Sequence, residues 1–242
     1  FISCLLGLLL SACAKTTTVR SMAGHENLIH SSQLGIILPS ASEVKTIGMF
    51  GNVKNCYEYA DYVSNLLEKR LAVALNERGF KVRVLSKSDI KDKEFYRALL
   101  NLRRQYDTKL SELYIRNKMF KLGENIEKAT DISVDVSTDA KIIGQHTQGD
   151  LLVMVNYDQE DTTTAKKWSN MFLKSDNFDS STLLIGLVDV DKGRLIWSNA
   201  FALHNSFIWS GFKSNKEKME IEHVDNMIKQ VLADFPFKAA KK

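Results

Sequence analysis

Three thiols have the clearest capacity for chemistry, because a thiolate is both a nucleophile and a metal ligand. They are Cys4, Cys13 and Cys56. Cys13 follows the small residues Ser11 and Ala12, which end the apolar run 1–10. This run is shorter than the roughly 20 apolar residues that span a bilayer, and it is typical of the apolar part of a signal peptide before its cleavage site. Cys56 is then the only thiol of the folded domain, so no internal disulfide is expected and we predict a small buried residue there.

The four residues that end at Cys13 resemble the bacterial lipobox: Leu10, Ser11, Ala12 and Cys13. The resemblance implies that the Cys13 thiol carries a diacylglycerol, that the chain is cut before Cys13, and that the new amine is acylated with a fatty acid such as palmitate. Several acyl chains make a stable anchor, since each buried methylene contributes about 0.8 kcal/mol. Ala14 stands where an Asp would retain the protein in the inner membrane, so the resemblance implies the outer membrane. We expect a basic segment and an initiator Met before Phe1.

The segment after Cys13 is polar and without periodic pattern up to about Ser32. We predict a flexible tether over residues 13–33, which would reach about 20–25 Å on average. The folded domain is then expected to lie near the bilayer without having to touch it.

Metal and catalytic motifs are weak in this sequence. The histidines are His25, His30, His146, His204 and His223. None has the spacing of a metal site such as His-Glu-x-x-His. The acidic stretches 158–161 and 189–193 each resemble part of a calcium loop but lack its closing Glu. Neither a Gly-x-Ser-x-Gly elbow nor a phosphate-binding Gly loop occurs. We therefore expect no metal, no cofactor and no enzymatic activity.

Hydrophobic periodicity predicts an α/β fold with a mixed sheet of about five strands and helices packed on it. Apolar or alternating runs predict strands at 34–38, 44–50 (or an extension of the first), 80–85, 151–157, 182–190 and 194–202, and helical spacing predicts helices at 59–78, about 89–128, 138–146 and 215–235. The turn Asp191–Gly193 joins the last two strands into a hairpin. The prediction is a single domain over 34–237 with a helical insertion at about 88–128 and a polar loop at 159–179.

Two stretches are candidate partner surfaces. Along the long helix, Leu99, Tyr106 and Leu113 recur every seven residues, as in a helix that pairs with another. We favour the alternative that this helix packs across the domain, and a third possibility is that its basic face rests on anionic lipid. The second stretch is aromatic and contains Phe207, Trp209 and Phe212. These side chains could form a partner pocket, since aromatics dominate interface energetics, or could close the core against the last helix.

Three stretches together resemble a group of envelope lipoproteins that includes the penicillin-binding-protein activator LpoB, the N-terminal domain of TolB and the curli secretion lipoprotein CsgG. They are the strand–helix–Gly–strand unit at 44–85, the start of a strand at Gly149–Val153 and the hairpin Leu187–Ser198. The resemblance covers roughly half of the chain. It implies a small periplasmic α/β domain without enzymatic activity that binds or assembles with other envelope proteins. The long helical insertion and the loop at 159–179 depart from the group. We find no alternation typical of a membrane β-hairpin, so a pore is not expected.

Charge argues against one further class. The chain has 33 Lys and Arg against 29 Asp and Glu, a net charge of +4, without the dense basic stripe of a nucleic-acid binder.

Taken together, these observations predict an outer-membrane lipoprotein whose periplasm-facing domain is a non-enzymatic binding or assembly accessory with an envelope protein as partner. Two alternatives stay open: a regulator of peptidoglycan synthesis, which the resemblance suggests, and a domain that binds a small ligand or is an enzyme.

Overall fold

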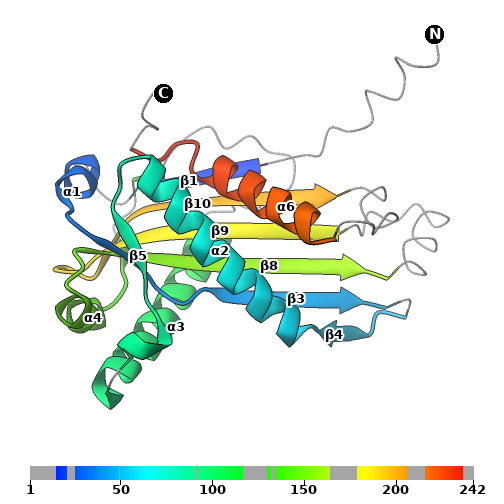
Figure 1. Cartoon of the computed structure of the whole chain (residues 1–242), viewed down its shortest axis with the longest axis horizontal. Coiled ribbons are helices and arrows are strands. Elements are labelled where there is room, and N and C mark those ends of the chain that lie inside the picture. The colour runs from blue at the N-terminus through cyan, green and yellow to red at the C-terminus, as the bar shows by residue number, and fades with distance from the viewer. Residues whose placement is uncertain are drawn as a thin grey trace, which may run out of the picture.

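The computed structural model describes residues 15–20, 25–48, 50–90, 92–116, 130–131, 134–163, 179–205 and 216–236. Within them a twisted mixed sheet carries helices on both faces (Figure 1). The prediction of an α/β fold with a mixed sheet is confirmed. The described sheet has ten strands rather than about five. Two of the short strands, β2 and β5, fall within the predicted runs 34–38 and 80–85. The short strands β4, β6 and β7 have only two or three residues each and leave no hydrophobic pattern in the sequence.

The described residues form ten strands, five α-helices and one 3₁₀ turn. The strands are β1 Lys15–Arg20, β2 Gly35–Ile37, β3 Ala41–Ile47, β4 Val53–Asn55, β5 Val82–Val84, β6 Thr130–Asp131, β7 Val134–Asp135, β8 Leu151–Thr162, β9 Asp179–Asp189 and β10 Arg194–Asn205. The helices are α1 His25–Ser31, α2 Tyr57–Glu77, α3 Lys93–Arg116, α4 Asp139–Thr147 and α6 Lys216–Val231, and a 3₁₀ turn, η2, spans Lys87–Asp89. None of the described helices combines the length and apolarity that a membrane crossing requires.

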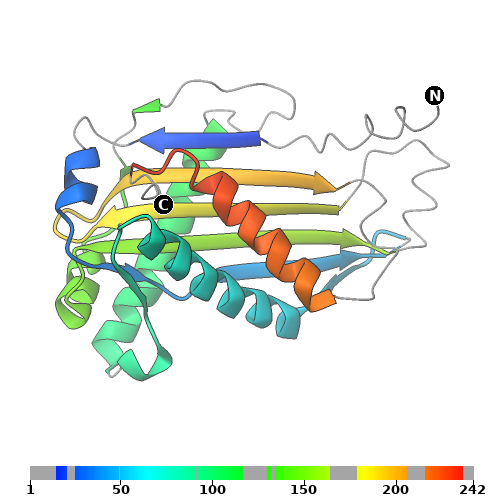
Figure 2. The ribbon, with the colours of Figure 1, turned by 45° about the horizontal axis from the view of Figure 1, so that its top comes forward.

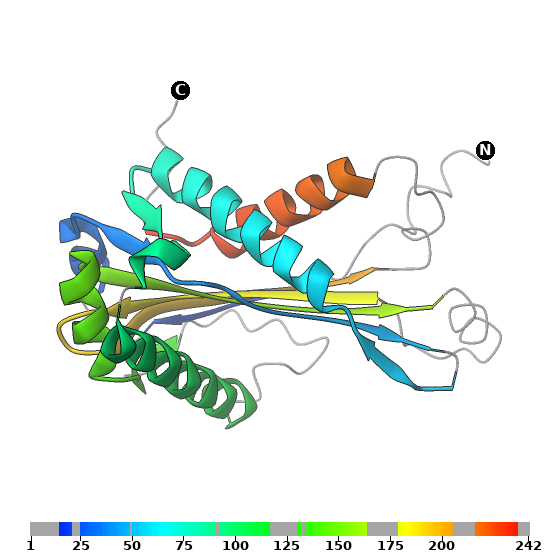
Figure 3. The same cartoon turned by 60° about the horizontal axis from the view of Figure 1, so that its bottom comes forward.

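The strand order along the main path of the sheet is β4-β3-β8-β9-β10-β1-β6. Strands β8, β9 and β10 form an antiparallel centre, while β2 and β3 run parallel to β8. The sheet separates two cores: α2 and α6 cover one face, and α3 and α4 cover the other (Figure 3). Strand β8 supplies both cores by alternation, since Val153 and Val155 face the α2–α6 side and Leu152 and Met154 face the α3–α4 side.

Helix α2 shows why these residues form these elements. Its buried side chains recur at three- and four-residue spacing and make one apolar stripe: Ala60, Val63, Leu67, Leu71 and Leu75. The helix stops because Gly79 adopts a φ of +87°, a left-handed conformation that glycine takes without strain.

The segment predicted as a tether is structured instead. Lys15–Arg20 pairs with β10 along its whole length, from Lys15 opposite Ala202 to Arg20 opposite Trp197, and His25–Ser31 forms α1. The physical reason is that three consecutive Thr residues and Val19 are β-branched, which favours an extended strand even without a hydrophobic alternation. The structure therefore differs from the predicted flexible tether at Lys15–Arg20 and His25–Ser31.

One end of the sheet collects several strand ends. The register runs across it from Lys15 in β1 to Ala202, then to Thr182, then to Asp158, and finally to Glu43 in β3. Strands β1 and β9 begin at this end, and β3, β8 and β10 finish there. We call it the hairpin end, because β3 continues past Glu43 into the β3–β4 hairpin; it lies on the right in Figures 1 and 2.

Candidate functional site

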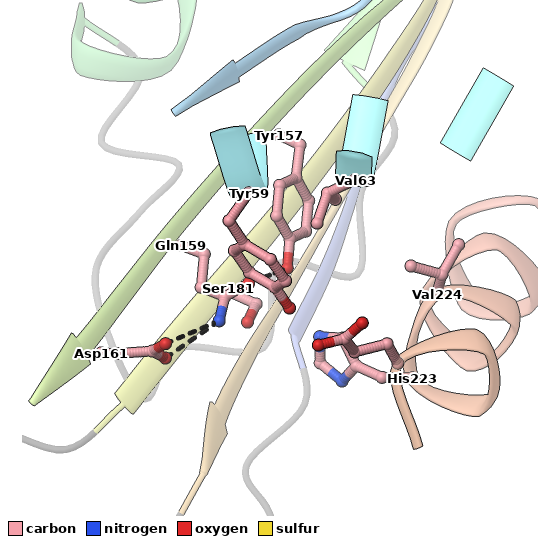
Figure 4. Close-up of a pocket in the computed structure, with 9 residues that line it drawn as sticks. Tyr59, Val63, Tyr157, Gln159, Asp161, Ser181, His223 and Val224 are labelled. Carbon is pink, nitrogen blue, oxygen red and sulfur yellow. Dashed lines mark hydrogen bonds between the residues drawn. The ribbon is translucent and has the colours of Figure 1, made fainter. Parts of the chain in front are cut away.

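A polar cleft opens between α2, α6 and the final third of β8, towards the hairpin end (Figure 4). We call it the α2–α6 cleft. Its lining residues are Tyr59, Val63, Tyr157, Gln159, Asp161, Ser181, Glu220, His223 and Val224. Helix α2 contributes the tyrosine and valine at its start, the two central strands contribute the amide, hydroxyl and carboxylate groups, and α6 contributes the histidine.

Alternation along β8 places three polar side chains on the same face of the sheet. Tyr157, Gln159 and Asp161 are each two residues apart, so they share the side that faces α2 and α6. The Tyr157 hydroxyl donates to Gln159 Oε1 at 2.7 Å, and Gln159 Nε2 donates to both Asp161 carboxylate oxygens at 2.9 and 3.0 Å. The result is a directed chain of hydrogen bonds that leads from the buried phenol to the carboxylate at the open end.

Burial sets the protonation states in the cleft. Burial raises the pKa of Tyr59, and the neighbouring Glu220 carboxylate raises it further. Burial also raises the pKa of Tyr157, so both phenols stay protonated near neutral pH. Burial lowers the pKa of His223, which keeps its imidazole neutral. The cleft therefore presents neutral hydrogen-bonding groups beside the two carboxylates Asp161 and Glu220.

The size of the cleft limits what it can hold. Its cavity volume is about 40 Å³, enough for one or two water molecules and well below the several hundred Å³ typical of small-molecule sites. Within the described residues, no three His, Cys, Asp or Glu side chains come together in a way that could hold a metal ion. As it stands, the α2–α6 cleft can order water or accept one small polar group.

A second feature is apolar and lies at the hairpin end. Phe50, Val53 and Tyr57 are 92%, 58% and 74% exposed, the highest exposures among the large hydrophobic residues that the structure describes. We call them the β3–β4 tip. Strand β4 is exposed along all three residues, and it forms the edge of the sheet beyond β3.

Helix α3 carries a smaller exposed apolar pair. Tyr96 and Leu100 are 52% and 53% exposed, and their four-residue spacing places them on one face of the helix. The ring of the preceding Phe95 lies 5.0 Å from that of His146 in α4, which places the start of α3 near the start of β8, at the end of the sheet opposite the hairpin end.

The residues predicted as a partner surface on the long helix are placed differently from that prediction. Tyr106 is fully buried against the sheet, so it belongs to the core and cannot contact a partner. Leu99 is partly buried and packs against the same core. Leu113 lies in α3, but its side chain is outside the described part of the structure. The seven-residue repeat failed because the buried stripe of α3 follows three- and four-residue spacing through Phe95, Ala98, Leu102, Tyr106 and Leu110.

The remaining predicted residues lie outside the described ranges. These are the lipobox residues Leu10, Ser11, Ala12 and Cys13 and the aromatic residues Phe207, Trp209 and Phe212. Cys56 is half-buried, with its sulfur 3.5 Å from the Thr46 hydroxyl. That position agrees with a packed side chain rather than an exposed nucleophile.

Sequence reasoning missed the α2–α6 cleft. The stretch 159–162 was assigned to a loop because it is rich in Asp, Glu and Gln, yet it continues β8 between β3 and β9. The available signal was the alternation of Tyr157, Gln159 and Asp161, which extends the period of two beyond the apolar run.

Comparison with known proteins gives distant structural matches only. No family model matches the chain, and no curated protein matches it. Among solved structures, a PelC dodecamer from Paraburkholderia phytofirmans is similar with 10% identity and a TM-score of 0.44, covering 94% of this chain and 99% of that chain. A second PelC dodecamer structure from the same organism has 10% identity and a TM-score of 0.40, covering 95% and 99%. The Evf virulence factor has 12% identity and a TM-score of 0.23, covering 86% and 88%.

Proposed function

We propose that this protein is an outer-membrane lipoprotein, anchored through Cys13, whose periplasm-facing domain is a non-enzymatic binding or assembly accessory of the cell envelope. The observation that carries the proposal is the sequence Leu10-Ser11-Ala12-Cys13, which ends an apolar run. In addition, β1 begins at Lys15, so an acylated Cys13 would hold the edge of the domain directly at the membrane.

The accessory role is supported by the distribution of exposed apolar side chains. The exposed pair Tyr96 and Leu100 lies on α3, whose start is at the end of the sheet opposite the hairpin end, and aromatic residues are enriched where proteins meet. The α2–α6 cleft, by contrast, contains phenols and a histidine that are buried in their neutral forms. The surface around Tyr96 and Leu100 is thus a better candidate for the binding function than the α2–α6 cleft.

The test measures two things in intact cells: the acylation of Cys13 and the capture of a partner protein. A photo-crosslinking amino acid at Leu100 in the full-length lipoprotein should capture one envelope protein, and mass spectrometry of the mature N-terminal peptide should show acyl groups on Cys13. The same crosslinker at the exposed Lys69 of α2, on the opposite face of the sheet, is the matched control, and Cys13→Ala should abolish capture. An unmodified Cys13, or capture that is identical at both positions and in Cys13→Ala, would refute the proposal.

A regulator of peptidoglycan synthesis is the second candidate, favoured by the hairpin Leu187–Ser198 that resembles the LpoB-containing group. It requires that the captured protein is a peptidoglycan synthase and that the purified domain raises its rate of glycan polymerisation. A small-ligand or enzymatic role would rest on the α2–α6 cleft. It requires a ligand whose concentration shifts the unfolding temperature in a saturable way.

A further inference from the structure

The most exposed apolar side chains of the described chain lie together at one end of the sheet. Phe50, Val53 and Tyr57 fall within eight residues, on the β3–β4 turn, on β4 and at the start of α2, respectively. Single exposed hydrophobic residues are common on protein surfaces, but three neighbours that exceed all others in exposure mark an interaction surface.

The backbone of the turn holds Phe50 outward. Gly48 N–H donates to the Asn52 carbonyl at 2.8 Å, and Gly51 N–H donates to the Gly48 carbonyl at 3.0 Å. Gly51 has a φ of +79°, which a residue with a side chain would rarely adopt. These bonds close a tight turn at the end of the β3–β4 hairpin, so the exposure of Phe50 is built into the backbone.

The register places this turn at the same end of the sheet as the start of β1. Lys15 is level with Glu43 across the sheet, and β3 runs on from Glu43 to the turn. One residue, Ala14, separates Lys15 from Cys13, so the Cα atoms of Cys13 and Lys15 lie at most about 7 Å apart. Four strand spacings separate β1 from β3, which is about 19 Å at about 4.8 Å per strand.

We propose that the β3–β4 tip inserts into the lipid interface of the membrane that holds Cys13. This inference rests on the proposed function, because the acylated Cys13 is what brings the hairpin end to the bilayer. Tyrosine side chains favour the boundary between lipid headgroups and acyl chains, where the apolar ring and the polar hydroxyl are both satisfied, and a phenylalanine ring can be buried at the same depth. Tyr57 fits this boundary, since its hydroxyl accepts a hydrogen bond from Asn55 at 3.2 Å.

Two attachment points have a consequence that a single anchor does not have. A lipid on Cys13 alone would let the domain rotate about its N-terminus. The β3–β4 tip adds a second membrane contact, about 19 Å from β1 across the strands. The turn also reaches further along the strand direction than Lys15 does. The lipid on Cys13 and the β3–β4 tip can therefore both lie in the membrane surface when the strands are tilted from the membrane normal. The domain would then keep a fixed orientation, with the α3 pair Tyr96 and Leu100 at the far end.

The test measures lipid contact at position 50 in the full-length acylated protein. The protein carries Cys56→Ser and Phe50→Cys, and the new thiol is labelled with an environment-sensitive fluorophore; a thioether at Cys13 blocks that position. It is reconstituted into vesicles of phosphatidylethanolamine and phosphatidylglycerol with or without nitroxide-bearing lipid. The matched control is Tyr96→Cys in the same background, an exposed aromatic position at the opposite end. Circular dichroism and the unfolding temperature confirm that both labelled proteins are folded.

We expect nitroxide lipid to quench the fluorophore at position 50 several-fold more strongly than at position 96. Equal quenching at the two positions, with acylation of Cys13 verified by mass spectrometry, would overturn the insertion and leave the proposed function intact. A blue-shifted emission at position 50 without nitroxide quenching would mean that a protein, such as a second copy, covers the tip, and this also overturns the proposal. Absence of acyl groups on Cys13 would overturn both proposals together.

Discussion

The side chain of Tyr106 on α3 packs directly onto Gly186 in the middle of β9. A Cβ atom at position 186 would lie 2.3 Å from the Tyr106 hydroxyl oxygen and 2.9 Å from its ring carbon Cε2. These distances are shorter than any van der Waals contact, so only glycine allows the ring to lie this close to the strand. The glycine therefore fixes how closely α3 approaches the sheet.

Gly186→Ala should destabilise the domain by about 1–3 kcal/mol, because the added methyl group overpacks a core that has no room for it. The backbone of Gly186 pairs normally within β9, between β8 and β10, so the cost comes from packing and not from a lost hydrogen bond. Urea unfolding followed by circular dichroism gives the change in the free energy of unfolding.

The matched partner variant is Tyr106→Phe, which removes the atom nearest to the added methyl group. Gly186→Ala combined with Tyr106→Phe should cost less than the sum of the two single changes, with a coupling of about 0.5–3 kcal/mol. Strict additivity would show that Tyr106 does not meet position 186 in solution.

Helix α3 also shows how far the sequence predicts this fold. The existence of the helix followed from its apolar periodicity, because every buried side chain of an amphipathic helix repeats at three or four residues. The structure agrees with the favoured interpretation that this helix packs across the domain. The alternative, a partner surface, is wrong for Tyr106, because a seven-residue repeat samples only part of the buried stripe. The glycine that receives Tyr106 lies 80 positions further along the chain, and no local pattern connects two such residues.

Arg103 ties α3 to the sheet through its guanidinium group. Its Nη1 donates to the Val155 carbonyl at 3.1 Å and to Asn156 Oδ1 at 2.7 Å, and its Nη2 donates to the Pro39 carbonyl. Burial lowers the pKa of Arg103, but the side chain stays charged near neutral pH. We expect Arg103→Lys to lower the free energy of unfolding by about 1–3 kcal/mol, because one ammonium group cannot satisfy acceptors that lie in different directions.

The control for this change is Arg104→Lys on the adjacent, exposed position. It should leave the urea midpoint almost unchanged, since surface substitutions usually fall within about 0.5 kcal/mol. Equal effects at positions 103 and 104 would mean that the guanidinium fork contributes nothing specific to docking of α3.

The stability of the domain should depend on pH through His223. Burial lowers the pKa of His223 below its ordinary value of 6.5, although the carboxylates Asp161 and Glu220 line the same cleft and would favour the charged form. In the unfolded chain the imidazole binds a proton near pH 6.5, whereas the folded protein keeps it neutral to lower pH. The unfolded state thus holds more protons in this window, and the free energy of unfolding should fall as pH decreases from 7.5 to 5.5.

His223→Gln should flatten this dependence, whereas His30→Gln at an exposed position of α1 should preserve it. Urea midpoints at half-unit pH steps measure the slopes. Asp158 has a pKa that burial raises from its ordinary value of 3.8, which gives the opposite slope, and because His223→Gln leaves Asp158 in place, the difference between the two proteins isolates the contribution of His223. A slope that is unchanged in His223→Gln would show that another group controls the acid response.

The α2–α6 cleft marks the limit of what the sequence could reveal about a site. Its residues come from α2, β8, β9 and α6, four elements separated by up to 165 positions from Tyr59 to Val224. Individually, a tyrosine near a helix start or a histidine in an amphipathic helix is unremarkable. Only the strand order and the crossing of the two helices bring them together, and these depend on tertiary packing rather than on local propensity.

The length of flexible chain between Cys13 and the folded domain depends on whether Lys15–Arg20 forms strand β1 in solution. A strand would be protected from hydrogen exchange by its pairing with β10, from Lys15 opposite Ala202 to Arg20 opposite Trp197. We expect amides in this segment to exchange far more slowly than an unstructured peptide. Thr17→Pro should reduce the protection, because proline lacks an N–H and its fixed φ of about −65° departs from that of a β-strand, while Thr17→Ala, which keeps the N–H, should retain it. Exchange at the unstructured rate in the unsubstituted protein would restore the flexible tether of about 20–25 Å. The domain could then stand off the bilayer. A protected β1, by contrast, leaves only Ala14 between Cys13 and the strand, and the hairpin end must then lie at the membrane surface.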